Sequence, residues 1–512
     1  MGTTGYRSER IAETDQAQTG IEGWQADRAG QPFWKGVLSP RRLRQRGLGC
    51  CTTLYNAQPR PCSNGMTALT PPIHPLRSTD LGPLAMLGTL RGNALAMWGR
   101  RAYERPAMVG SFLGRMQVLL NDPDAIAHVL VRNAANYRRP GVSRRVLGPL
   151  VGDGLLLSEG ADWRHQRRTI APILAPRSMP VLTRHVLVAA EETRVRLAQA
   201  KGAMELLPAM QRAALDIAGR SMFSLEMAER GGPMRELLTR FAMTLARPSV
   251  FDLLFPPELP TPRDGARRRF RAEWLALIGG IVDARAALLA ANGPRDLFDL
   301  LVAARDPETG EAFTRSQLCD QVATMILAGH ETTALALFWS LALLAQSPDW
   351  QDRVAAEAAG TDLHAPDAAA ALPVTRAVIS EALRLYPPAF LITREALARD
   401  VANRTMIPRG ATVAIAPWVL HRHTALWDRP HTFDPARFMP DAPPPPRFAY
   451  LPFGAGPRIC VAAQFAMAEA VLMLATLVGA FRVASDDIAG VRPVGRVTTQ
   501  PDRAAHFTFV AR

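Results

Sequence analysis

The run VATMILAGHETTALALFWSLALLA (322–345) restricts the fold of this chain more than any other feature. It is long enough to cross a bilayer, for which about 20 apolar residues suffice. His330, Glu331, Thr332 and Thr333 stand at its centre, and each charged residue buried in lipid costs about 2 kcal/mol or more. We therefore expect a long helix through the middle of a globular protein rather than a transmembrane anchor, and its central polar residues then need a function.

The rest of the chain predicts a mainly α fold with a minor β part. The segment 115–131 predicts a short strand, a turn and a helix beginning near Asp122–Pro123. A second β pattern covers 406–420, with Gly410 in its turn, and another lies near the C-terminus. Long amphipathic helical patterns cover 179–201, 204–246, 265–292 and 315–347.

Residues 1–65 differ in character from the rest of the chain. They show no sustained periodicity, and they contain the basic cluster RRLRQR (41–46). We expect this segment to be a disordered extension, or an upstream region included by a misassigned start, and residues 66–512 to form a single domain. A folded N-terminal domain is the alternative.

The cysteines and the polar N-terminal sequence predict a cytoplasmic location. Three of the five cysteines lie within residues 1–65, which leaves Cys319 and Cys460 in the body of the chain. That is not a disulfide framework. The first residues lack the apolar core of a signal peptide.

The net charge of +14 does not by itself indicate nucleic-acid binding. Apart from Lys35 and Lys201 the positive charge is arginine, scattered along the chain. We expect a solvated basic surface, with docking of an acidic protein as the alternative, and no nucleic-acid partner. A nucleic-acid binder would have its affinity concentrated in 41–46.

The stretch LPFGAGPRIC (451–460) places one cysteine after a glycine-rich turn. A Cys460 thiolate could bind zinc, an iron–sulfur cluster or haem iron. Zinc and clusters usually need several Cys or His ligands at short spacing, and none lies near Cys460. A single thiolate is what a haem with an axial cysteine requires.

The neighbours of the cysteine fit that assignment. Gly454 and Gly456 allow a tight turn that brings amide groups near the sulfur. A helix beginning at about Val461 would lower the pKa of the thiol. Phe453 can shield the sulfur, and Arg458 can reach a haem propionate.

The string Phe453-x-x-Gly456-x-Arg458-x-Cys460 resembles the haem-binding signature of the cytochrome P450 superfamily. Ala462 stands where the family usually has glycine, and we expect haem still to fit. Four further motifs resemble those of the family, in its order, within roughly residues 80–510. They are Trp163-x-x-x-Arg167, AGHETT (328–333), Glu381-x-x-Arg384 and FDPARF (433–438), which contains Arg437.

The resemblance implies the cytochrome P450 fold and haem b with Cys460 as its axial thiolate. It assigns Trp163 and Arg167 to a haem propionate, and Arg394 to another propionate contact. It also implies a structural network of Glu381, Arg384 and Arg437, in which a buried carboxylate lies between two guanidinium groups.

The resemblance further implies the space for a substrate. Ala328 is expected to leave room above the haem, and the strand after the Glu381 helix is expected to line the pocket with Phe390, Leu391 and Ile392. The apolar segment 247–264 is expected to form part of an access lid. These residues favour a hydrophobic small molecule such as a fatty acid or a terpenoid.

The implied reaction is a monooxygenation with O2. Glu331 can relay protons from solvent, and Thr332 can hydrogen-bond the oxygen that is being activated. The alternative is structural, with Thr332 bonded to a carbonyl of its own helix and Glu331 in an ion pair.

Few residues follow Cys460, so electrons are expected from a separate ferredoxin or flavodoxin-type donor with its reductase. Arg164 and Arg168 are candidates for docking it. Two alternatives remain: a haem-thiolate enzyme that uses peroxide, and a non-enzymatic haem-thiolate sensor or carrier.

Overall fold

The computed structural model describes residues 69–224, 231–256, 258–287 and 294–512. They belong to a compact unit that extends from Arg60 to Arg512. The extension predicted for residues 1–65 lies outside the described residues.

Helices dominate the described chain, which confirms the mainly α class with a minor β part. The predicted continuous pattern over 204–246 is wrong in one respect, because Ser224 adopts a left-handed conformation (φ +47°) and ends a helix there. The α-helices are α1 (Pro83–Gly92), α2 (Pro123–Ala127), α3 (Gly141–Val151), α4 (Gly160–Ile170), α5 (Met179–Ala198), α6 (Leu206–Phe223), α7 (Gly231–Thr244), α8 (Val250–Leu254), α9 (Asp264–Ala286), α10 (Leu297–Ala303), α11 (Arg315–Ala345), α12 (Pro348–Ala359), α13 (Pro373–Leu385), α14 (Pro417–Leu420) and α15 (Ala463–Ala480).

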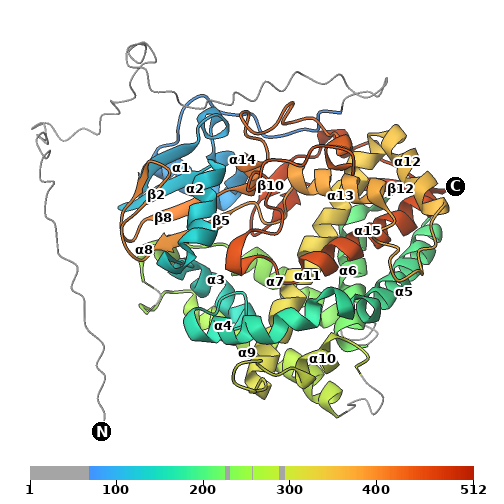
Figure 1. Cartoon of the computed structure of the whole chain (residues 1–512), viewed down its shortest axis with the longest axis horizontal. Coiled ribbons are helices and arrows are strands. Elements are labelled where there is room, and N and C mark those ends of the chain that lie inside the picture. The colour runs from blue at the N-terminus through green and yellow to red at the C-terminus, as the bar shows by residue number, and fades with distance from the viewer. Residues whose placement is uncertain (1–68, 225–230, 257, 288–293) are drawn as a thin grey trace, which may run out of the picture. The chain divides into compact units, whose positions relative to one another are not determined.

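The largest sheet has five strands in the order β1-β2-β8-β5-β3, in which only β2 and β8 are parallel neighbours. It lies to the left in Figure 1, away from the helices α5, α6 and α15. The other sheets pair β10 with β11, β6 with β7, and β12 with both β4 and β9. The strands are β1 (Ala107–Phe112), β2 (Arg115–Leu120), β3 (Tyr137–Arg138), β4 (Met204–Glu205), β5 (Ile392–Ala396), β6 (Asp400–Ala402), β7 (Thr405–Ile407), β8 (Thr412–Ile415), β9 (Phe481–Ala484), β10 (Pro493–Gly495), β11 (Thr499–Pro501) and β12 (His506–Ala511).

The local sequence patterns place three of these strands correctly, β2, β7 and β8. β2 is followed by α2, whose N-cap Asp122 accepts a hydrogen bond from the amide of Ala125 at 2.8 Å. β7 and β8 flank Gly410, whose φ of +77° lies in the region that glycine adopts without steric cost.

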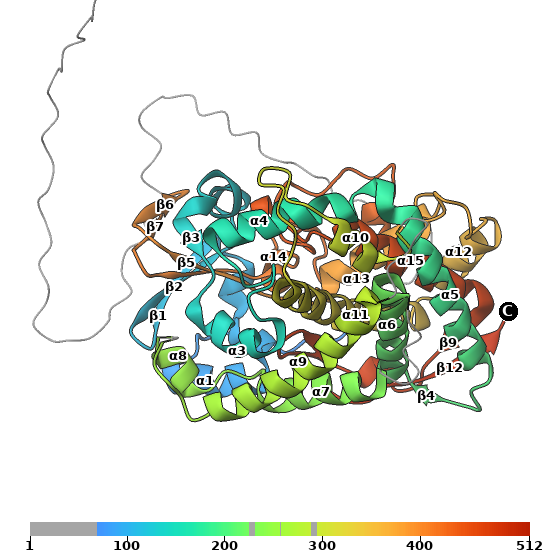
Figure 2. The ribbon, with the colours of Figure 1, turned by 90° about the horizontal axis from the view of Figure 1, so that it is seen from below.

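Helix α11 is the long apolar helix that the sequence predicts. Thr314 and Gln317 form a capping box at its start. The helix packs against α3, α6, α9, α13 and α15, and Figure 2 shows it enclosed by neighbouring helices. Both α11 and α15 are long and apolar enough to span a membrane, but 72% and 56% of their most apolar stretches are buried within the fold. Burial in the protein core therefore explains the apolar composition of both helices.

The cysteine loop is held by two glycines with positive φ. Gly454 has a φ of +71° and Gly456 a φ of +75°. A Cβ atom on Gly456 would lie 1.8 Å from the carbonyl oxygen of Leu130, whereas one on Gly454 would meet only Ile392 Cδ1, at 3.8 Å. The turn closes where the amide of Cys460 donates to the carbonyl of Phe453 at 2.9 Å.

A buried ion pair joins α13 to the segment after α14. Glu381 and Arg384 are fully buried and make two parallel bonds of 2.7 and 2.8 Å. Arg384 also donates to the carbonyls of His421, Pro430 and Thr432, so that all five of its N–H groups are used. Arg437 lies at the edge of this pair, with its Nε 3.5 Å from a Glu381 oxygen.

The two glycines of the cysteine loop give a matched pair of variants. Gly454→Ala is expected to cost about 1–2 kcal/mol of folding free energy, because alanine is strained at positive φ. Gly456→Ala is expected to cost clearly more, because the backbone at Leu130 would also have to move. The urea midpoint of unfolding measures both, and equal losses would contradict the close contact at Leu130.

Glu381→Gln is expected to destabilise the protein by about 3–5 kcal/mol, because the buried Arg384 loses its counter-ion. The unfolding midpoint and the haem content of the purified variant should both fall. The control is Asp283→Asn, which breaks an exposed pair with Arg315 whose bonds of 2.6 and 2.7 Å have similar geometry. The control should change stability by no more than about 1 kcal/mol, and a similar loss in both variants would contradict the assignment.

Candidate active site

The Cys460 thiol stands directly before α15, where Ala462 is the N-cap residue. Cys460 is exposed to solvent, although many protein atoms surround its sulfur. Burial raises the pKa of the thiol, while a hydrogen bond from the Ala462 amide and the charge of Arg167 act in the opposite direction. The predicted lowering at the helix end is present in the hydrogen bond from the N-cap residue Ala462, but burial outweighs it and the pKa of the thiol is raised overall.

Helix α4 is bound to the cysteine loop through Trp163 and Arg167, the two residues that the sequence analysis assigns to a haem propionate. Arg167 Nη1 donates to the carbonyl of Ile459 at 2.9 Å. The Arg458 guanidinium lies 4.6 Å from the centre of the Trp163 ring, which is a cation–π contact. Arg458 also donates to the Ser158 carbonyl at 3.1 Å and pairs with Glu159.

Arg139 and Arg394 form a cluster of positive charge with Arg458. Arg394, on β5, is buried, and its pKa is lowered to about 10 by burial and then by the charge of Arg458. Arg139 was not predicted from the sequence; its pKa is lowered to about 9 by burial and then by repulsion from Arg394 and Arg458. Glu159 is the carboxylate that offsets this cluster, and Arg139 Nε is buried without a partner among the described residues.

The centre of α11 exposes a small residue, although most of the helix beyond its first turn is buried. Ala328 is exposed, while His330, two residues on, is buried. Burial lowers the pKa of His330 to about 4, so its imidazole is neutral at physiological pH. The Thr332 hydroxyl donates to the carbonyl of Ala328 at 2.5 Å. This is the bond of the structural alternative, in which Thr332 bonds to a carbonyl of its own helix.

Glu331 is held by a part of the chain that the sequence did not indicate. Its Oε1 accepts hydrogen bonds from Thr498 Oγ1 at 2.9 Å and from Gln500 Nε2 at 2.5 Å. Both donors lie in the β10–β11 region near the C-terminus. The predicted proton relay, Glu331, therefore links α11 to this hairpin, and it forms no ion pair with any residue that the structure describes.

A second carboxyl group connects α11 with α15. Thr333 Oγ1 lies 3.3 Å from Glu469 Oε2, and both residues are buried. Burial raises the pKa of Glu469 to about 8, so this group is mostly protonated at pH 7. Glu469 lies six residues beyond the start of α15, or about 9 Å along the helix. The contact therefore fixes the two helices to each other near the cysteine loop.

The residues predicted to line the substrate pocket lie where β5 begins, beside the cysteine loop. Ile392 lies beside Gly454 of the cysteine loop, and Leu391 is half-buried against the core. Phe390 is buried and packs edge-on against Trp98, with ring centres 6.4 Å apart.

These residues fit a haem group held by one thiolate. The accessible thiol supplies the axial ligand. The guanidinium groups of Arg139, Arg394 and Arg458, of which Arg394 is buried and the other two half-buried, exceed their carboxylate partner and suit the two propionates of a haem. Among the described residues no group of three His, Cys, Asp or Glu side chains could hold a metal ion.

Comparison with known proteins agrees with this chemistry. The family model "Cytochrome P450" matches residues 97–501. Cyclooctatin synthase of Streptomyces melanosporofaciens is 33% identical over 380 residues, which are 72% of this chain and 81% of that protein. Cyclooctat-9-en-7-ol 5-monooxygenase from the same organism is 29% identical over 77% of this chain and 87% of that protein.

The fold is also that of a solved haem domain. The crystal structure of the cytochrome P450DA haem domain superimposes with a TM-score of 0.70 at 24% identity, covering 86% of this chain and 97% of that one. The family match extends over most of the chain, and the 33% identical relative covers more than two thirds of it. The chain therefore belongs to the cytochrome P450 family of haem-thiolate monooxygenases.

Proposed function

We propose that this protein inserts one oxygen atom of O2 into a hydrophobic small molecule, with haem held by Cys460 and with Glu331 and Thr332 delivering protons. The observation that carries the proposal is the accessible Cys460 thiol in a loop that also carries Arg458, which clusters with the half-buried Arg139 and the buried Arg394. The bound haem supplies the site at which O2 is reduced and the substrate oxidised. All remaining roles belong to side chains of the chain itself.

Arg139, Arg394 and Arg458 are proposed to bind the propionates, together with Trp163 and Arg167. Arg458 stacks on Trp163 and Arg167 bonds to the cysteine loop, so these two orient the loop as well. Phe453 and Gly456 shape the loop around the sulfur. Together these propionate-binding and loop residues hold the haem in one orientation and exclude water from the thiolate.

Thr332 is proposed to act as a hydrogen-bond acceptor. Its single O–H is donated to the Ala328 carbonyl, which leaves the two lone pairs of its oxygen free. It can therefore accept a hydrogen bond from a protonated oxygen in the exposed space beside Ala328. In this way the observed bond orients the hydroxyl for the predicted role.

Glu331 is proposed to pass protons toward Thr332 from the side of the β10–β11 hairpin. Oε1 is occupied by Thr498 and Gln500, and it is held in place by them. Oε2 has no bond to another described residue and can accept and release a proton. A carboxyl group next in sequence to the threonine is suited to a relay.

The proposed substrate is a hydrophobic molecule of the fatty acid or terpenoid kind. Leu391 and Ile392 line the approach to the cysteine loop, and Ala328 leaves room above it. The lid segment displays Phe251, Leu254 and other exposed apolar side chains. One relative acts, by its name, on cyclooctat-9-en-7-ol, and an alkenol is compatible with such a site.

Electrons are proposed to come from a ferredoxin or flavodoxin-type protein with its reductase, in the cytoplasm. Arg164 is exposed on α4 and remains a candidate docking residue. Arg168, the second candidate, is bound to Asp306 by bonds of 3.0 and 2.8 Å, so its charge is largely neutralised. A partner that reads positive charge on α4 would therefore contact Arg164 first.

The first test is the carbon monoxide difference spectrum of the dithionite-reduced protein, in full length and from Met66. A strongly red-shifted Soret band in both forms would establish thiolate ligation and show that residues 1–65 are not required. Cys460→Ser should abolish that band. Cys319→Ser, which alters the other described cysteine, should retain it, and a band typical of a neutral ligand in the unaltered protein would contradict the proposal.

Thr332→Ala is expected to lower product yield several-fold while reductant is still consumed and appears as peroxide, because proton delivery loses its acceptor. Thr332→Ser should restore most of the yield. Ser340→Ala removes the same type of bond, from a side chain to the carbonyl four residues earlier, and should leave the yield unchanged. A sensor or carrier would be indifferent to all three variants, and a peroxide-using enzyme would not lose peroxide-driven activity in Thr332→Ala.

A further inference from the structure

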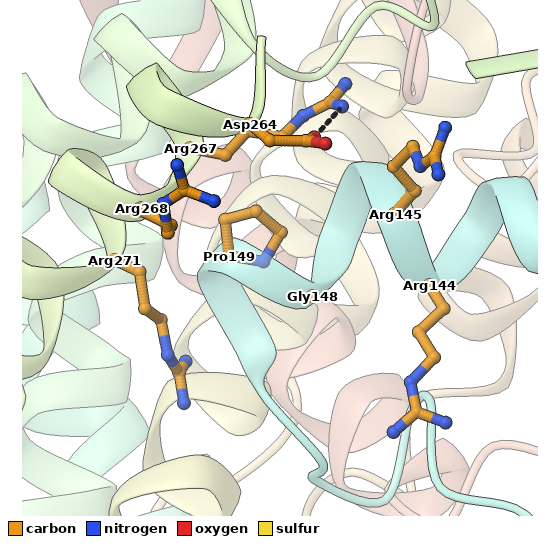
Figure 3. A pocket seen from close by; sticks show the side chains of 8 residues that line it. All are labelled: Arg144, Arg145, Gly148, Pro149, Asp264, Arg267, Arg268 and Arg271. Atoms are coloured by element: carbon orange, nitrogen blue, oxygen red, sulfur yellow. Dashed lines mark hydrogen bonds and ion pairs between the residues drawn. The ribbon is translucent and has the colours of Figure 1, made fainter. Parts of the chain in front are cut away.

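A pocket lined mainly by arginine lies between α3 and α9, apart from the cysteine loop and its arginine cluster. Its volume is about 380 Å³. Figure 3 shows that the lining residues come from both helices, Arg144, Arg145, Gly148 and Pro149 from α3 and the other four from α9. The charged residues of the lining are Arg144, Arg145, Asp264, Arg267, Arg268 and Arg271.

Carboxylates neutralise only part of this charge. Arg267 is bound to Asp252 by bonds of 2.7 and 2.9 Å, and Figure 3 shows its further bond to Asp264. Arg271 is bound to Asp320 at 2.5 Å. These two arginines are therefore committed to holding α9 in place.

The other three arginines are available to a ligand in different degrees. Arg144 pairs with Asp153 at 2.7 Å, but both side chains are well exposed, and such pairs are weak in water. Arg268 is exposed and makes no hydrogen bond or ion pair with another residue that the structure describes. Arg145 is only 8% exposed and bonds to neutral carbonyl oxygens, those of Pro256 and Leu259, at 2.6 and 2.5 Å.

Two buried N–H groups at the pocket also have no acceptor within the described chain. They are Nη1 of Arg145 and Nε of Arg267. A buried donor without a partner is unfavourable, and a guanidinium group is best satisfied by oxygen atoms of a carboxylate or a phosphate. The unmatched charge of the exposed Arg144 and Arg268 favours a carboxylate or phosphate ligand, and the two buried donors show that the described chain supplies too few acceptors for the arginines gathered here.

We propose that this pocket binds a small molecule that carries a multivalent oxyanion, and that the anion bridges Arg144 on α3 and Arg268 on α9. The volume suits a small ligand, since such sites usually measure about 300–1,000 Å³. Bound anion would also secure the lid, because Arg145 holds the backbone after α8 and Arg267 holds Asp252 within α8. The site does not depend on the haem or on the proposed reaction.

The test is isothermal titration of the haem-loaded, full-length protein with pyrophosphate and with citrate, against sodium chloride at equal ionic strength. Saturable binding of at least one of the two anions is expected. Arg144→Gln and Arg268→Gln should each weaken it about tenfold or more. Arg269→Gln is the matched control, because Arg269 is exposed next to Arg268 but is not part of the pocket lining.

Tighter binding of pyrophosphate would identify a phosphate-bearing ligand, and tighter binding of citrate a polycarboxylate; both support the site. Two results would overturn it. One is the absence of any saturable heat beyond that of sodium chloride. The other is an equal loss of affinity in Arg269→Gln, which would indicate only a diffuse effect of surface charge.

Discussion

The cysteine loop can lie against the backbone at Leu130 because residue 456 has no side chain. A single Cβ would come within 1.8 Å of the Leu130 carbonyl oxygen, far inside van der Waals contact. This approach fixes the loop between the helical turn at Leu130 and the start of β5, where Ile392 meets Gly454. The position of the thiol, and therefore of the group that it binds, is set by a contact between two backbones.

The electrostatics of the site favour an anionic guest. Three guanidinium groups share one carboxylate, and burial, followed by their mutual repulsion, lowers the pKa values of Arg139 and Arg394. Glu469, the buried carboxyl group on α15, is mostly protonated at pH 7 and so adds little negative charge. A group that brings two carboxylates relieves this imbalance, so its binding adds directly to the stability of the folded state.

Sequence patterns were most reliable where local chemistry decides the outcome. The α11 helix, the β2–α2 unit and the Glu381–Arg384 pair follow from periodicity, capping and short motifs. Arg139, Thr498 and Gln500 did not, because each acquires its role only through partners distant in the sequence. The break after Phe223 was also missed, since a left-handed serine carries no strong pattern of its own.

Several contacts that build the site join distant parts of the chain. Arg458 meets Glu159 across 299 positions, Arg167 meets Ile459 across 292, and Glu331 meets Thr498 across 167. Closing such loops is slow compared with forming local helices. During synthesis the residues of the N-terminal half cannot make these contacts until the cysteine loop has been translated. The availability of haem therefore affects folding at a late step, when the two halves of the chain come into contact.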